Sequence, residues 1–335
     1  MTLSSILGSR LKREWYRGSL PLEIFGNNKN LSLDLKESRL DFIPWRSAQT
    51  KRYEDHVYQR VLSSSIEQVS REEFLSYRKI EGIFQRVSQS VKKKDWSQVE
   101  RVSMDEISIR KGYRDFVTLV SHVDTGNLLE VIDSHQQSEI IDVLKQQPLS
   151  LREQVKEVSV DMWGGFPKVI EEVFPNAVVV FDRFHVMKLL NQQLNKLRNL
   201  LGIKTKGSRY LLFKNFEELT EEQKDQLASV LNQSEILKIA YELKSEFRSI
   251  YETSKTVKSG YNRFKKWLRL AQIIYGKAAE TIRKHLDGIC NYFISRTTSG
   301  VMEGINNKAK LILRQGYGFS DFSHFRARLL GSFSD

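Results

Sequence analysis

The sequence predicts an α/β protein in which a mixed sheet is interrupted by a long helical segment and preceded by a small helical domain. Residues 157–188 have the hydrophobic pattern of a strand, a helix and a second strand, and an aspartate follows each strand. Residues 102–132 contain three short apolar runs bounded by turn residues, as β-hairpins do. Residues 191–294 have the period of helices almost throughout. These three observations set the fold class.

Composition excludes several classes of protein. The chain has 335 residues, 40% of them hydrophobic and 28% charged, which is an ordinary profile for two or three compact units. No apolar run approaches the roughly 18 residues that a membrane span needs, and the N-terminal segment lacks the pattern of a signal peptide. A single cysteine, Cys290, excludes an internal disulfide framework and a multi-cysteine zinc site. The sequence therefore predicts a soluble protein of a reducing, cytoplasmic setting.

Positive charge is concentrated in one stretch. The net charge is +12, and residues 253–279 hold seven Lys and Arg with no acid, interleaved with aromatic residues. A basic stripe with aromatics is typical of a surface that binds a polyphosphate such as nucleic acid, although a solvated helix face has the same composition. The candidate DNA-binding residues of this stripe are Lys258, Arg263, Lys265, Lys266, Trp267 and Arg269.

Residues 46–97 predict three short helices with a tight turn before the last. Ser65 and Gln68 have the spacing of a helix cap, and Ser76 precedes the third helix. This is the outline of a helix-turn-helix domain, although any small helical bundle has a similar pattern. On the third helix the candidate DNA-binding residues are Arg78, Lys79 and Arg86. Residues 1–45 are interpreted as an N-terminal arm.

Between residues 98 and 190 the order of elements is β-β-β-α-β-α-β, which matches the ribonuclease-H-like fold. Asp105 follows the first strand, Asp161 the fourth and Asp182 the fifth. Since chemistry gathers at the carboxyl ends of parallel strands, we expect Asp105 and Asp161 to lie side by side. The alternative is that such aspartates are turn residues or helix caps.

The last motif, residues 299–319, predicts an amphipathic helix. Val301, Ile305, Ala309 and Ile312 define its apolar face, and the opposite face holds Glu303, Asn307, Lys310 and Arg314. Glu303 is a candidate third acid beside the sheet, although a surface ladder of ion pairs would have the same spacing.

Three segments together resemble the ISL-three type of bacterial insertion-sequence transposase over about residues 45–330. They read MDEISIRKGYRDFVTLVSHVDTG, VSVDMWGGFPKVIEEVFPNAVVVFDRFHVMKLLN and MEGINNKAKLILRQGYGFSDFSHFR. The resemblance implies a ribonuclease-H-like core with catalytic acids Asp105, Asp161 and Glu303. It also places Asp182 and His185 in the family's FDxFH element. Its closing element matches Asn306, Lys310, Arg314, Tyr317 and Gly318, and the first three of these are further candidate DNA-binding residues.

The resemblance also implies chemistry and partners. Three carboxylates suit two Mg²⁺ (or Mn²⁺) ions, with Asp105 bridging both and Asp161 and Glu303 holding one each. The enzyme would cut the ends of an insertion sequence and join them to target DNA, acting as a homodimer on double-stranded DNA beside the bacterial nucleoid. The implied divisions are an arm (1–45), a DNA-binding domain (46–97), a catalytic core (98–190 and 295–335) and a helical insertion (191–294).

The chain departs from the family in two places. It has no cysteine-rich segment before the helix-turn-helix, which implies altered recognition of DNA ends, and it has Ser299 where the family tends to have Asn. Two alternatives therefore stay open beside the transposase. One is a ribonuclease-H-like nuclease specific for DNA structure, and the other is an inactive, transposase-derived DNA-binding protein.

Overall fold

The computed structural model describes residues 49–90, 94–109, 116–162, 165–297, 300–316, 319 and 321–333. The described residues between 94 and 308 form one compact unit, and those up to 90 together with those from 309 onward form a second. The predicted arm, residues 1–45, lies outside the described residues, as do Ser299, Tyr317 and Gly318. Each unit is described separately below.

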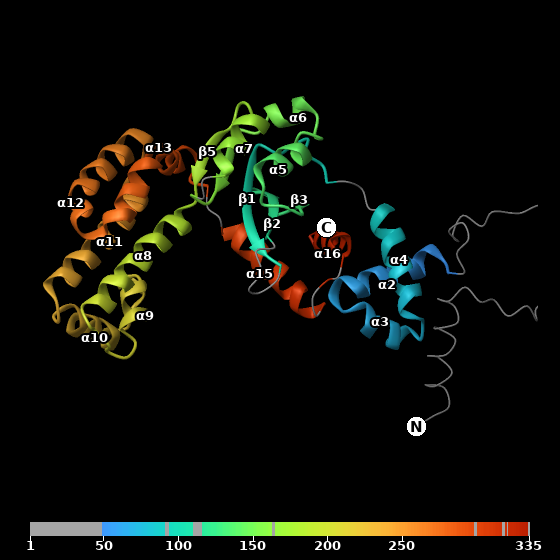
Figure 1. Cartoon of the computed structure of the whole chain (residues 1–335), viewed down its shortest axis with the longest axis horizontal. Coiled ribbons are helices and arrows are strands. Elements are labelled where there is room, and N and C mark those ends of the chain that lie inside the picture. Colours follow the sequence, from blue (N-terminus) through green and yellow to red (C-terminus); the bar gives the residue numbers. More distant parts are fainter. Residues whose placement is uncertain are drawn as a thin grey trace, which may run out of the picture. The chain divides into compact units, whose positions relative to one another are not determined.

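A five-stranded mixed sheet is the centre of the larger unit (Figure 1). Its strands, in the spatial order β3-β2-β1-β4-β5, are β1 (Arg101–Ser108), β2 (Phe116–His122), β3 (Leu128–Ile132), β4 (Glu157–Val160) and β5 (Val178–Phe181). Strands β1, β2 and β3 pair antiparallel, whereas β1, β4 and β5 run parallel. The predicted order of strands and helices is confirmed, with α5 (Gln137–Leu144) and α7 (Phe166–Val173) in the expected places and one additional short helix, α6 (Leu149–Glu153).

The two faces of the sheet have different chemistry because side chains alternate along each strand. On β1, Val102 and Met104 are buried in the main hydrophobic core together with residues of α5 and α7. Ser103 and Asp105 therefore point to the opposite face. The same alternation on β4 separates the core residues Val158 and Val160 from Glu157 and Ser159. The polar face is the one on which the candidate site is built.

The segment after β5 is entirely helical, as predicted, apart from its connections. Its helices are α8 (Arg183–Leu200), α9 (Ser208–Phe213), α10 (Glu221–Leu231), α11 (Glu235–Thr253), α12 (Val257–Lys284), α13 (Leu286–Cys290) and α14 (Tyr292–Ser295), with a 3₁₀ turn at Phe216–Glu218. Helix α10 begins after Thr220, whose side chain forms a capping box with Gln223. Helix α13 packs against the edge strand β5, where Asn291 Nδ2 donates to Val179 O at 2.8 Å.

The predicted DNA contact of Trp267 is wrong. This side chain is fully buried, and its indole Nε1 donates to Leu243 O at 2.8 Å. Its ring centroid lies 4.6 Å from that of Phe247, and Phe264 and Tyr275 are buried in the same core. Phe264, Trp267 and Tyr275 are separated by three and eight residues, which places them on one helix face, and α12 packs on α11.

A buried lysine lies in the same helical segment. Lys244 is 2% exposed, and its Nζ donates to Leu212 O at 2.7 Å and to Lys214 O at 3.3 Å. Burial and, after it, the positive charge of Arg248 lower the pKa of Lys244 to about 8. The charged form is therefore disfavoured in the folded protein despite its two acceptors.

We expect this lysine to make stability depend on alkaline pH. An unfolded lysine has a pKa of about 10.4, so between about pH 8 and pH 10.4 the unfolded chain holds a proton that the folded protein has released. The free energy of unfolding should rise with pH over this window, by up to about 3 kcal/mol relative to Lys244→Met. Urea denaturation of both proteins at about pH 7 and about pH 10 measures the difference. An unchanged difference between the two proteins would contradict the prediction.

The smaller unit contains the predicted helix-turn-helix. Its helices are α2 (Lys51–Ser63), α3 (Ile66–Glu73) and α4 (Tyr77–Ser90). Ser65 accepts a hydrogen bond from Gln68 N at 3.1 Å, which confirms it as a helix cap. Phe74 ends α3 in the left-handed conformation (φ 54°) and turns the chain into α4. The buried core of these helices includes Tyr53, Val57, Ile80, Ile83 and Phe84.

The predicted C-terminal part of the catalytic core, 295–335, is divided between the two compact units. Their boundary falls within α15 (Gly300–Gln315), after residue 308. Helix α16 (Phe322–Gly331) packs against α2 and α4, where Gln85 Nε2 and His324 Nε2 lie 2.7 Å apart. The physical reason is apolar burial, since Phe325 and Leu329 are fully buried.

Among the described helices, none combines the length and the hydropathy that crossing a membrane requires.

Candidate active site

Three aspartates lie at the same edge of the sheet, on or directly after its three parallel strands. Asp105 was predicted to follow the first strand, but it lies within β1, which continues to Ser108, whereas Asp161 and Asp182 directly follow β4 and β5. Ser103 of β1 pairs with Ser159 of β4, so two residues further along Asp105 and Asp161 occupy neighbouring positions. Asp161 and Asp182 are neighbours in the same way, because Asp182 N donates to Val160 O at 2.9 Å. The predicted proximity of Asp105 and Asp161 is thus a consequence of strand register.

Asp182 both caps a helix and binds a histidine. It is 4% exposed, one carboxylate oxygen accepts from Phe184 N at 2.9 Å at the start of α8, and the other lies 2.9 Å from His185 Nδ1. Burial by itself would lower the pKa of His185. The hydrogen bond to Asp182 and the negative charges of Asp161, Asp182 and Asp105 outweigh burial and raise it. The protonated, positively charged form of His185 is therefore favoured beside these three carboxylates.

Asp105 is held by a residue from the other end of the sequence. Asn306 of α15 donates from Nδ2 to Asp105 Oδ2 at 2.6 Å. Burial raises the pKa of Asp105 in spite of this bond. The neighbouring Glu106 has its pKa raised to about 7, first by burial and then by the negative charges of Asp105 and Asp161. This edge of the sheet thus concentrates carboxylates in a partly desolvated place.

Glu303 is on the helix that reaches this site. Its side chain is exposed, one turn before Asn306 on α15. Within the described ranges no three His, Cys, Asp or Glu side chains converge as metal ligands, so Glu303 is not gathered with Asp105 and Asp161. The predicted apolar face of α15 needs one correction, because Val301 is 37% exposed and Met302 is buried in its place.

Comparisons with known proteins show the family of this chain. Residues 102–329, more than half of the chain, match the family described as Transposase, and residues 38–88 match the helix-turn-helix domain of transposase family ISL3. The chain belongs to the ISL3 family of transposases. It is 26% identical over 316 residues to the transposase for insertion sequence element IS1001 of Bordetella parapertussis, an alignment that covers 88% of this chain and 77% of that relative. It is 24% identical over 318 residues to the transposase for IS1557 of Mycobacterium tuberculosis, covering 83% and 71% of the two chains.

The oxygen atoms at Asp105 are of the kind that a divalent cation takes. Asn306 Oδ1 is a buried oxygen with no hydrogen-bond partner among the described residues, and its residue is bonded to Asp105. Oxygen ligands of this kind are preferred by Mg²⁺ and Mn²⁺. A nearby cation would also stabilise carboxylates whose pKa is raised by burial and by mutual repulsion.

One residue of the candidate site was not found by sequence reasoning. Asn306 was predicted to contact DNA, whereas the structure bonds it to Asp105. No periodicity could have shown that bond, because it joins residues 201 positions apart.

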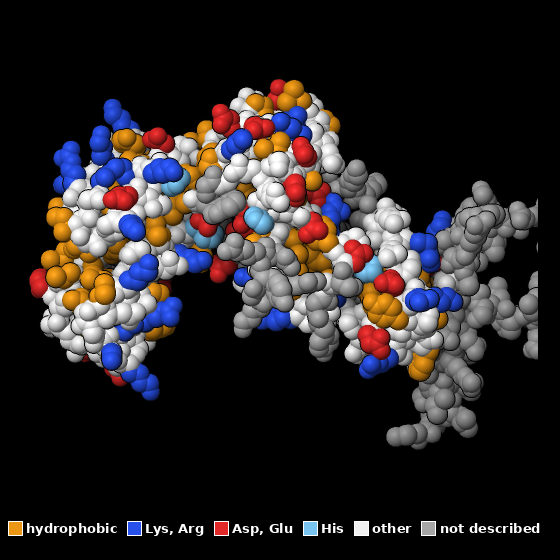
Figure 2. All heavy atoms as spheres, viewed as in Figure 1, with side chains coloured by type: hydrophobic (Ala, Val, Ile, Leu, Met, Phe, Trp, Pro, Cys, Tyr) orange, Lys and Arg blue, Asp and Glu red, His pale blue; other side chains and the backbone are white. Residues whose placement is uncertain are grey.

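The remaining candidate DNA-binding residues are mostly exposed cations. In the helix-turn-helix, Arg78 and Lys79 are exposed in the first turn of α4, whereas Arg86 forms an ion pair of 2.7 Å with the buried Glu54. Figure 2 shows Lys and Arg side chains spread over the surface of the helical insertion. The exposed candidates outside the helix-turn-helix are Lys258, Lys265, Lys266, Arg269, Lys310 and Arg314. Arg263 is half-buried and donates to Thr253 and Ser254.

Proposed function

We propose that this transposase cuts the ends of an insertion sequence and joins them to target DNA by phosphoryl transfer, at a divalent-metal site formed by Asp105, Asp161 and Glu303. The observation that carries the proposal is the register of β1 and β4, which brings the first two acids together at the carboxyl ends of parallel strands. The third acid is on α15, which already contacts Asp105 through Asn306.

The fold is consistent with a ribonuclease-H-like core. Its three antiparallel strands are followed by two parallel ones, in the order β3-β2-β1-β4-β5, and helices connect the parallel strands. In that fold an acid on the first strand lies beside the acid that ends the fourth, which are the positions of Asp105 and Asp161 here. The helical insertion then separates β5 from the helix that contains Glu303.

Each protein group has a separable task in this proposal. Two Mg²⁺ or Mn²⁺ ions held by the three acids would activate the attacking oxygen and stabilise the leaving oxygen of an in-line displacement. Asn306 fixes the orientation of the Asp105 carboxylate. Asp182 holds His185, whose raised pKa favours the protonated ring, and that ring can donate a hydrogen bond to a DNA phosphate beside the acids.

The exposed cations provide the binding surface for double-stranded DNA. Arg78 and Lys79 are at the start of the second helix of the helix-turn-helix, the position from which such domains enter the major groove. Lys and Arg side chains on the insertion and on α15 neutralise phosphates, so affinity should fall steeply as salt increases. Because two ends must be processed together, we propose that the protein acts as a homodimer on DNA.

The test of this function is cleavage of a labelled duplex that joins the end of the element to its flank. With Mg²⁺ or Mn²⁺ we expect a nick that leaves a 3′-hydroxyl at the end of the element, followed by a joined product when target DNA is added. Chelation by EDTA should abolish both products and leave DNA binding in place. A duplex with a scrambled end sequence is the matched control.

Two other outcomes would replace the proposal with the alternatives. Cleavage of branched DNA irrespective of end sequence, without joined product, would indicate a structure-specific nuclease built on the same acids. Salt-sensitive binding without cleavage in either metal would indicate a DNA-binding protein that has lost catalysis.

A further inference from the structure

Three pairs of side chains form successive levels on the polar face of β1 and β4. Arg101 pairs with Glu157 and Ser103 with Ser159, and the same register continues to Asp105 and Asp161. Alternate residues of a strand face the same side, so all three levels share the face opposite to the main hydrophobic core. The catalytic acids are at one end of this series, and the Arg101–Glu157 level is at the other.

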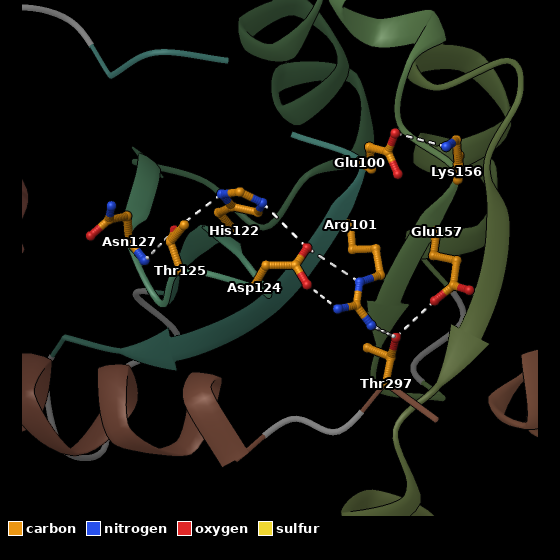
Figure 3. Close-up of polar contacts among 9 residues, drawn as sticks. All are labelled: Glu100, Arg101, His122, Asp124, Thr125, Asn127, Lys156, Glu157 and Thr297. Atoms are coloured by element: carbon orange, nitrogen blue, oxygen red, sulfur yellow. Dashed lines mark hydrogen bonds and ion pairs between the residues drawn. The ribbon is translucent and has the colours of Figure 1, made fainter. Parts of the chain in front are cut away.

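The Arg101–Glu157 level holds the segment that leads into α15 (Figure 3). Glu157 is 5% exposed, and its Oε2 accepts hydrogen bonds from the hydroxyls of Thr297, at 2.7 Å, and of Ser295. Arg101 Nη1 donates to the same Thr297 hydroxyl at 3.3 Å. Thr297 itself is 3% exposed, and its hydroxyl also lies 2.7 Å from the hydroxyl of Ser295.

The turn between β2 and β3 contacts both Arg101 and the beginning of α15. Arg101 forms an ion pair with Asp124 of this turn, and Asp124 is 3.4 Å from His122 Nε2. Gly126 has a φ of +75°, and a Cβ at this position would lie 3.4 Å from Val301 Cγ1 in the first turn of α15. The turn therefore packs against the beginning of α15 while its aspartate fixes Arg101.

The stretch from Thr297 to α15 is thus attached at two levels of the same face. Thr297, just before the helix, binds the Arg101–Glu157 level, and nine positions later Asn306 of α15 binds Asp105. Between them the sheet presents Ser103 and Ser159, small side chains that are 4% and 1% exposed. Met302 and Ile305 of the helix are buried.

We propose that Arg101, Glu157 and Thr297 act as a positioning clamp that sets where α15 lies along the sheet, and thereby where Glu303 and Asn306 meet Asp105. This inference rests on the proposed function of Asp105 and Glu303. The clamp is at the opposite end of the strands from the acids, so it acts only through α15. A displacement of about 1 Å at a reacting centre can cost about a hundredfold in rate, which gives the clamp a catalytic consequence.

The test compares Thr297→Val with Thr297→Ser. Valine keeps the shape of threonine but removes the hydroxyl that joins Arg101 to Glu157, whereas serine retains it. We expect Thr297→Val to lower the rate of DNA-end cleavage at saturating DNA by about tenfold to a hundredfold, with unchanged Kd for the DNA. Thr297→Ser should restore most of the rate. Glu100→Gln is the matched control, because it removes an exposed ion pair with Lys156 beside the clamp.

A second measurement does not depend on activity. Amide hydrogen exchange over residues 300–308 should be faster in Thr297→Val than in wild type or Thr297→Ser, while exchange in β1 and β4 stays the same. If the wild-type protein cleaves no DNA, the proposed function fails and the exchange comparison still decides whether the clamp holds α15. Wild-type exchange in α15 of Thr297→Val would overturn the inference. So would a loss of rate that Thr297→Ser shares.

Discussion

Asp161→Asn is expected to abolish metal-dependent cleavage of the element's end. Asparagine has the size of aspartate and keeps one oxygen, but it lacks the charge that holds a divalent ion. Losing such a ligand removes several kcal/mol of transition-state stabilisation, or roughly a thousandfold in rate. The measurement is single-turnover cleavage of a labelled DNA end in Mg²⁺ and in Mn²⁺, together with DNA affinity by fluorescence anisotropy.

DNA affinity should not fall in the same variant. Asp161 lies among Asp105, Glu106 and Asp182, so removing one negative charge lowers the repulsion felt by a phosphate. Asp142→Asn, at an exposed position of α5, serves as the control for the chemical change and should cleave as wild type does. Wild-type cleavage by Asp161→Asn would contradict the assignment of this acid. Glu303→Gln is tested in the same assay, and a comparable loss of cleavage is expected if the third acid belongs to the site.

Trp267→Ala is expected to destabilise the helical insertion by about 3–5 kcal/mol, the cost of removing a large aromatic side chain from a packed core. The side chain is fully buried between α11 and α12, and its loss also leaves the Leu243 carbonyl without its indole donor. Urea denaturation followed by circular dichroism measures the effect. The neighbouring Lys266→Ala is the control, since Lys266 is exposed and should change stability by less than about 0.5 kcal/mol.

When DNA affinity is measured, substitution of Lys266 should have the larger effect and substitution of Trp267 the smaller one. Lys266→Ala should weaken binding and reduce the dependence of affinity on salt by about one counterion, as expected for one phosphate contact. Trp267→Phe, which keeps most of the buried volume, should bind DNA as wild type does. A loss of affinity in Trp267→Phe without a loss of stability would show that the indole contacts DNA after all.

The local pattern of hydrophobic and turn residues was enough to predict most of the helices and strands. The strand–helix–strand unit at 157–181 and the hairpin at 116–132 were predicted within a few residues, because alternation and turn residues act over short distances. Alternation also showed which face of β1 and β4 each side chain takes, since a slip of one residue would turn the apolar residues out of the core. The order of elements, which matches the ribonuclease-H-like fold, then predicted that Asp105 and Asp161 are neighbours.

The sequence pattern predicted least well those side chains whose residue type suits both a DNA-binding surface and a contact inside the protein. Trp267 fits a basic surface by composition and a helix core by spacing, and the core prevailed because burying an aromatic ring stabilises the fold more than exposing it does. Arg86 was predicted to be a DNA contact, and the structure pairs it with a buried carboxylate. In both cases the deciding partner is on another helix.

The family, the order of elements and the aspartates at the edge of the sheet could all be predicted from the order of the residues. The folded chain was needed to show that Asn306 binds Asp105, that Thr297 binds Glu157, and that the C-terminal helix packs on the helix-turn-helix. These contacts join residues far apart in the chain, across a helical insertion of about a hundred residues. Short-range periodicity has no information about such contacts, because they depend on how whole elements pack.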